Sequence, residues 1–281
     1  TVFKGAGLTL PKAVCVRFGD KSAVFDPETL SFPLVWSGGF VKLGDNRHGF
    51  MGGGMMDGQV LSKAADKLHG VYHGFYRHGS EVIFSQSVHG MPRLATARGE
   101  VPALASKIQG GLAQRPQSLE PRGELGSQTP FATDRLTLPF DNPYGTLFFV
   151  TAHDFFSDGA SAAIATMTGE VWLVKGIDEG LETLRWKRFA TSLHQPLGMR
   201  IIDDKIHVLG RDQITRLHDL NGDDEADFYE CVTNAMQTSP GGHDFIVGLE
   251  TDAQGRWYFA SGNPGIRRLP GRDKLELLPT G

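Results

Sequence analysis

Oxygen-bearing side chains recur at short, regular intervals between residues 219 and 230. Aspartate, asparagine or glutamate stands at positions 1, 3, 5, 9 and 12 of this twelve-residue stretch, as Asp219, Asn221, Asp223, Asp227 and Glu230. A hard cation such as calcium needs several oxygen ligands that a tight turn wraps round one centre. The spacing therefore predicts a structural calcium site. Position 6 departs from the pattern, because Asp224 stands where glycine normally permits the sharp bend. The alternative is an acidic, solvated turn.

A glycine-flanked histidine is the candidate for acid–base chemistry. His243 precedes two strand-like runs, 245–249 and 256–260, which a turn connects. A neutral imidazole can accept a proton near neutral pH because its ordinary pKa is about 6.5. The neighbouring Asp244 could orient the ring, although adjacent residues of an extended chain point to opposite sides. The alternative is an ordinary loop histidine beside a hairpin.

Pairs of short strands repeat along the second half of the chain. Corresponding residues Val171, Ile214 and Ile266 lie 43 and 52 positions apart, close to the roughly 40–50 residues of a propeller blade. The predicted strand pairs are 162–166 with 171–174, 206–209 with 214–217, and 257–260 with 266–269. About three blades fit into the sequence, whereas a closed propeller needs at least about four. We therefore expect an incomplete propeller, or one whose sheets are closed by strands of the first segment.

Three segments follow from the spacing of strands and breakers. Residues 1–100 alternate apolar runs with glycine and charged turns, which predicts a β-sandwich-like domain. Residues 101–135 are rich in proline and glycine and are the expected linker, and residues 136–281 are the expected blades. The predicted fold class is mostly β, with an N-terminal β-sandwich-like domain followed by part of a β-propeller.

Composition limits the classes of function. The 281 residues are 40% hydrophobic, with a net charge of −4, 36 glycines and 15 prolines. The chain has no surplus of basic residues, which argues against binding of nucleic acid. No stretch reaches the roughly 18 apolar residues of a membrane-spanning helix. Cys15 and Cys231 could form a disulfide or remain buried thiols. Neither lies in a C-x-x-C-H motif, so haem is not expected on this chain.

Several motifs resemble those of glucose/sorbosone dehydrogenase-type quinoprotein propellers. They include Asp154-Phe-Phe-Ser-Asp-Gly, Gly169-Glu-Val-Trp-Leu and Gln195-Pro-Leu-Gly, and the resemblance covers about residues 137–270. Trp36-Ser-Gly-Gly-Phe and Gly74-Phe-Tyr-Arg-His resemble the domain that precedes the propeller in exported bacterial membrane-bound dehydrogenases.

The resemblance implies an exported or periplasmic oxidoreductase acting on the CH–OH group of a sugar or alcohol. It makes His243 the general base, pyrroloquinoline quinone the hydride acceptor, and a cytochrome c domain or protein the electron acceptor. Arg211, Asp212 and Asp244 are the candidate residues lining the funnel, and residues that clamp the quinone are expected on later blades. The alternative is a non-catalytic carbohydrate-binding or scaffold propeller, because a fold does not fix its chemistry.

Overall fold

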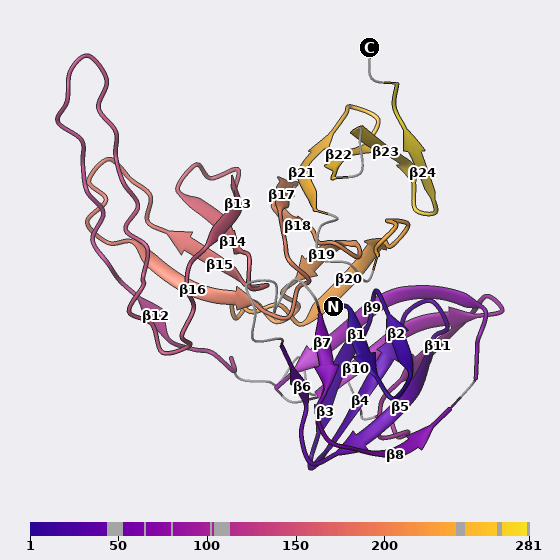
Figure 1. The fold of residues 1–281 in the computed structure, drawn as a ribbon. Helices are drawn as coiled ribbons and strands as arrows, with labels where there is room; N and C mark the ends of the chain where they lie inside the picture. Colours follow the sequence, from indigo (N-terminus) through magenta and orange to yellow (C-terminus); the bar gives the residue numbers. More distant parts are fainter. Residues whose placement is uncertain are drawn as a thin grey trace.

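All regular secondary structure in the described part of the chain is β-strand, which confirms the predicted fold class (Figure 1). The computed structural model describes residues 1–43, 53–64, 66–79, 81–101, 103, 113–239, 245–262 and 266–279. Those residues contain no helix that is long and apolar enough to cross a membrane.

Three consecutive four-stranded antiparallel meanders form the second half of the molecule. Each strand pairs with the next one along the chain, which is the connectivity of propeller blades. The predicted strand pairs are confirmed as the second and third strands of each meander. Blade 1 is β13 (Val150–Phe155), β14 (Ser161–Thr166), β15 (Val171–Lys175) and β16 (Arg185–Ala190); blade 2 is β17 (Gly198–Ile202), β18 (Lys205–Leu209), β19 (Ile214–His218) and β20 (Phe228–Thr233); blade 3 is β21 (Ile246–Thr251), β22 (Trp257–Ser261), β23 (Ile266–Gly271) and β24 (Lys274–Leu277).

The first strands of the three blades, β13, β17 and β21, lie side by side. Separate apolar cores fill the spaces between blades: Val171, Leu173, Val208 and Leu217 belong to the core between blades 1 and 2, whereas the core between blades 2 and 3 includes Leu209 and Phe259. Strands β14 and β15 are buried on both faces, because residues around 136–148 cover the face of blade 1 that points away from blade 2. Continuous apolar runs are expected in strands covered on both faces.

The N-terminal region forms two further sheets and one three-stranded ribbon. One core lies between the two sheets around Phe3 and Trp36, and another lies between the second sheet and the ribbon around Phe25 and Phe84. The first sheet is β1 (Phe3–Gly5), β2 (Leu8–Leu10), β6 (Val41–Lys42) and β7 (Gly54–Met56); the second is β3 (Val14–Phe18), β4 (Lys21–Asp26), β5 (Ser31–Ser37) and β8 (Gln59–Lys63); the ribbon is β9 (Gly70–His78), β10 (Glu81–Val88) and β11 (Met91–Ala95).

The N-terminal ribbon is continuous with blade 2. Strand β9 pairs with β20, the last strand of that blade, and the two units form one seven-stranded sheet. In the same way β12 (Ser118–Leu119) pairs with β16, the last strand of blade 1. Both outer edges are thus covered, which removes unpaired backbone groups that could join another chain. The segment boundary predicted at 101–135 divides the sequence but not this sheet.

Arg272, in the turn between β23 and β24, ties blade 3 to the same junction. Its guanidinium donates hydrogen bonds to the carbonyl oxygens of Cys231, at 2.6 Å, and of Tyr72. Cys231 is buried and Cys15 is half-buried, and both are free thiols. Burial raises the pKa of each thiol to about 12, so neither is a reactive thiolate at neutral pH.

Candidate functional site

A cluster of buried polar residues lies where blade 2 begins. The cluster consists of His194, Gln195, Arg211 and Asp212, from the segment before β17 and the turn between β18 and β19. Antiparallel pairing of Gly198 with Leu209 brings these two segments together. The Arg211 N–H also donates to the His194 carbonyl oxygen at 2.9 Å. We call this end of the blades the upper end.

His194 and Asp212 form a buried acid–base pair. The His194 Nδ1 atom lies 3.5 Å from the Asp212 Oδ2 atom, and the two side chains are only 6% and 16% exposed. Burial lowers the pKa of His194 to about 4. Burial would raise the pKa of Asp212, but the neighbouring His194 and other interactions outweigh it and lower that pKa to about 2. At neutral pH the imidazole is therefore neutral and the carboxylate is ionised, and a neutral imidazole can accept a proton.

Arg211 holds the cluster to the next stretch of chain. It is 1% exposed, and its guanidinium donates to Gln195 Oε1 at 3.3 Å and to the Ser239 carbonyl oxygen at 3.5 Å. The Thr238 hydroxyl in turn donates to the Arg211 carbonyl oxygen at 2.7 Å. Arg211 therefore fixes the chain immediately before residue 240, where the segment that carries His243 starts.

His243 and Asp244 lie outside the described residues, so their predicted roles stay predictions. Arg211 and Asp212 lie together in their turn: Asp212 lines a cavity, whereas Arg211 is buried against Gln195 and Ser239. Sequence reasoning missed His194. The available signal was the repeat itself, because His194 stands four residues before the first strand of blade 2 and His243 stands three residues before the first strand of blade 3.

A cavity of about 400 Å³ separates the cluster from the N-terminal sheets. His194, Gln195 and Asp212 line it from blade 2, and Tyr72 and Cys15 line it from the N-terminal strands. The lining residues in the described part of the chain include no lysine or arginine. The described lining of this upper-end cavity therefore offers no cationic side chain of lysine or arginine to a ligand with several carboxylates.

The predicted calcium loop joins β19 to β20 at the opposite, lower end. Asp219 accepts hydrogen bonds from the backbone N–H groups of Gly222, at 2.7 Å, and Asp224, at 2.8 Å. Asp227 accepts one from Leu220 at 2.8 Å. Asp224 adopts the left-handed conformation, with φ of 61°, so the bend expected of glycine is present with aspartate in its place.

The structure brings together four of the five predicted ligands and separates the fifth. Asn221 Nδ2 lies 3.2 Å from Asp223 Oδ2, and the nearby charges of Asp223 and Asp219 add to burial in raising the pKa of Asp227. Glu230 instead lies on β20, where its Oε2 atom is 2.6 Å from both Arg216 Nη2 and His218 Nε2. Throughout the described ranges, no three His, Cys, Asp or Glu side chains are arranged to hold a metal ion.

The buried imidazole predicts acid sensitivity. The folded-state pKa of His194 is about 4, below the ordinary value of about 6.5, so the unfolded chain binds the proton more tightly. The contribution of the neutral His194 side chain to the free energy of unfolding is complete above about pH 6.5. About 3 kcal/mol of that free energy is lost as the pH falls toward 4. Urea unfolding at pH 7.5 and 4.5 measures this loss, which we expect to shrink in His194→Gln. The exposed turn residue His89 is the control, and an equal pH dependence of His194→Gln and His89→Gln would contradict the prediction.

Comparisons with known proteins give no family. No protein-family model matches the sequence, and no curated protein matches it. Thirty-nine chains of solved structures match. One is the β-propeller domain of Myceliophteria thermophila Cps50 (Swd1), with 12% identity, a TM-score of 0.34, and coverage of 95% of this chain and 85% of that chain. The strand pairing of this chain itself defines the blades.

Proposed function

We propose that this chain carries substrate-facing blades of a propeller dehydrogenase that oxidises a hydroxyl group of a sugar or alcohol. The observation that carries the proposal is the upper-end cluster. Arg211 contacts both the His194 segment and Ser239, so a histidine-bearing segment of blade 2 and the described stretch that ends four residues before His243 meet at one buried polar centre. Sequence resemblance supplies the reaction type.

His243 is the proposed general base. Oxidation of a CH–OH group to a carbonyl releases the hydroxyl proton and a hydride from carbon. In this proposal the proton passes to the His243 imidazole, whose ordinary pKa leaves it mostly neutral and able to accept it. Arg211 contributes by holding the Ser239 carbonyl oxygen, four residues before the base, and Gln195 supports the Arg211 guanidinium, since a site is precise only when its supporting groups are held in place.

Pyrroloquinoline quinone is the hydride acceptor that the resemblance implies. The described residues give it no clamp, because no lysine or arginine is among the described residues that line the upper-end cavity and Arg211 is buried against Gln195 and Ser239. An exported or periplasmic location, and transfer of electrons to a cytochrome c, are proposed on the resemblance alone.

Dye reduction tests the function. Purified protein is incubated with pyrroloquinoline quinone and calcium, and reduction of an artificial acceptor is followed with a panel of sugars and primary alcohols. We expect substrate-dependent reduction of the dye, and parallel assays with and without added quinone show whether the quinone is the hydride acceptor. The absence of dye reduction with every substrate of the panel would reject the dehydrogenase and favour a non-catalytic carbohydrate-binding or scaffold propeller.

A calcium ion in the 219–227 loop is a second proposal, and it can be tested without any enzyme assay. In this loop the negative charges of Asp223 and Asp219 lie near Asp227. A bound cation would reduce the repulsion between these carboxylates. Asp219 would have to give up backbone hydrogen bonds to serve as a ligand. At a calcium concentration about 100 times Kd, binding adds about 2.7 kcal/mol, so we expect the melting temperature to rise by about 5–10 °C.

The matched variants are Asp223→Asn in the loop and Asp273→Asn in the β23–β24 turn, where the side chain is 83% exposed. Asp223→Asn should abolish most of the calcium response, and Asp273→Asn should retain it. A melting temperature that is unchanged by a chelator would reject calcium binding by this loop.

A further inference from the structure

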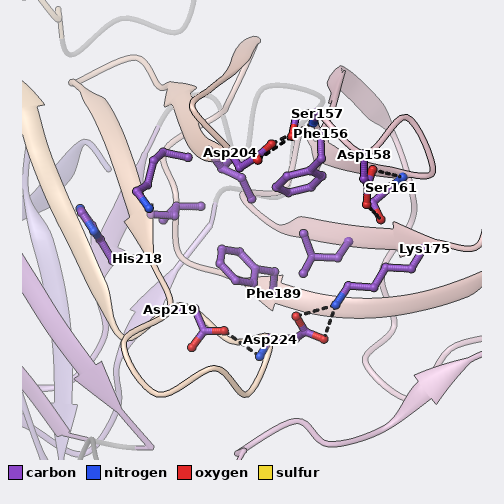
Figure 2. Close-up of a pocket in the computed structure, with 14 residues that line it drawn as sticks. Phe156, Ser157, Asp158, Ser161, Lys175, Phe189, Asp204, His218, Asp219 and Asp224 are labelled. Atoms are coloured by element: carbon purple, nitrogen blue, oxygen red, sulfur yellow. Dashed lines mark hydrogen bonds and ion pairs between the residues drawn. The ribbon is translucent and has the colours of Figure 1, made fainter.

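A second cavity, of about 390 Å³, lies between blades 1 and 2 at their lower end (Figure 2). Its walls come from the β13–β14 turn, the β17–β18 turn and the loop after β19. The upper-end cluster lies at the opposite ends of the same strands. The volume falls within the roughly 300–1,000 Å³ of small-molecule sites, and no proposed step of the dehydrogenase uses this cavity.

Two aromatic rings give the cavity apolar surfaces. Phe156 extends from the β13–β14 turn and Phe189 from β16, and Figure 2 shows both rings beside the space between the blades. Leu173, Ile206 and Leu217 complete the apolar lining. The rings provide flat faces against which the C–H face of a small ring-shaped ligand can pack.

Hydrogen-bonding groups surround these apolar surfaces. Asp204 accepts from the Ser157 N–H at 2.8 Å and from the Ser157 hydroxyl at 2.7 Å. Asp158 accepts from the backbone N–H groups of Ala160 and Ser161, both at 2.9 Å. These bonds lower the pKa of both carboxyl groups, so both are ionised acceptors at neutral pH. The Ser157–Asp204 bonds also join the two turns to each other.

The charges of the lining disfavour an anion. Four aspartates line the cavity against two lysines: Asp158, Asp204, Asp219, Asp224, Lys175 and Lys205. The Lys175 ammonium group lies 2.7 Å from Asp224, and the other carboxylates accept N–H or O–H groups of the protein. The two lysines offset two of the four negative charges, and the hydrogen bonds stabilise the other carboxylates. The lining thus offers carboxylate oxygens that accept hydrogen bonds and ammonium groups that donate them. A hydroxyl group can donate to the first and accept from the second.

We propose that this inter-blade cavity binds a neutral polyhydroxylated molecule of monosaccharide size, a sugar or polyol, packed against Phe156 and Phe189 and hydrogen-bonded to Asp204, Asp158 and Lys175. The site is separate from the proposed catalytic site at the upper end. It requires only the two blades whose strands and turns are described.

Calorimetric titration of the full chain tests the site, with uncharged monosaccharides and polyols as probes and with spermidine and inorganic phosphate as charged probes. We expect saturable binding of at least one neutral probe. Phe156→Ala should weaken that binding by about tenfold, because an aromatic contact contributes about 1.4 kcal/mol. Phe155→Ala is the matched control, since Phe155 is the preceding residue, is 48% exposed and does not line the cavity.

A second variant, Asp204→Asn, tests the site independently of whether Phe156→Ala folds. Asp204 has φ of 55°, a conformation that asparagine tolerates, so Asp204→Asn should keep its turn and weaken the neutral probe about threefold or more. His243→Asn should leave this binding unchanged even where it abolishes dye reduction, which separates the two proposals. Binding of spermidine or phosphate alone, or neutral binding that is unaffected by Phe156→Ala and Asp204→Asn, would overturn the proposal.

Discussion

Replacing His243 by asparagine is expected to lower the turnover of dye reduction by roughly 10²–10⁴, the usual contribution of a general base. Asparagine is similar in size to histidine and can still form hydrogen bonds, but it has no basic nitrogen to take up the hydroxyl proton. The Michaelis constant should change much less than the turnover, because proton acceptance acts in the transition state. Steady-state kinetics on the full chain with the best substrate of the panel measures both.

His89→Asn is the control for this variant. His89 lies in the exposed β10–β11 turn with φ of 50°, where asparagine is well tolerated, and it should retain full turnover. Both variants should melt at the temperature of the unmodified protein. If His243→Asn kept its turnover, the general base would lie elsewhere, and His194, whose neutral side chain lines the upper-end cavity, would be the next residue to test.

Replacing Gly74 by alanine is expected to destabilise the protein by about 2–5 kcal/mol. Gly74 lies opposite Glu230 where β9 joins β20. Its φ is 122°, and an added Cβ would collide with the Tyr229 carbonyl oxygen. Only glycine allows the two backbones to approach this closely. The loss should appear as a lower urea midpoint, because this pairing joins the N-terminal ribbon to blade 2.

Gly90→Ala separates the cost of the positive φ from the cost of the steric collision. Gly90 also has a positive φ, 78°, but an added Cβ would meet no atom within 4 Å. That variant should therefore cost only the conformational strain, about 1–2 kcal/mol. Equal losses in the two variants would show that the close approach at the β9–β20 junction contributes nothing to stability.

Local sequence determined the strands of the blades. The runs predicted at 162–166, 206–209 and 257–260 coincide with β14, β18 and β22 to within a residue or so, because side-chain alternation and turn residues act over a few positions. The sequence also marked position 6 of the loop as the place of a sharp bend, but it did not predict that Asp224 would make that bend in the left-handed conformation. The composition and turns likewise predicted the mostly β fold.

Tertiary structure decided the contacts between distant segments. Pairing of β9 with β20 joins residues more than 150 positions apart, and nothing in the local pattern of either strand specifies its partner. Glu230 fits a calcium loop by its spacing, yet the register of β19 and β20 places it opposite Arg216, where an ion pair forms. His194 reaches Asp212 only because β17 and β18 pair. The sequence thus specified the chemistry available to each segment, and long-range strand pairing determined which of those groups meet.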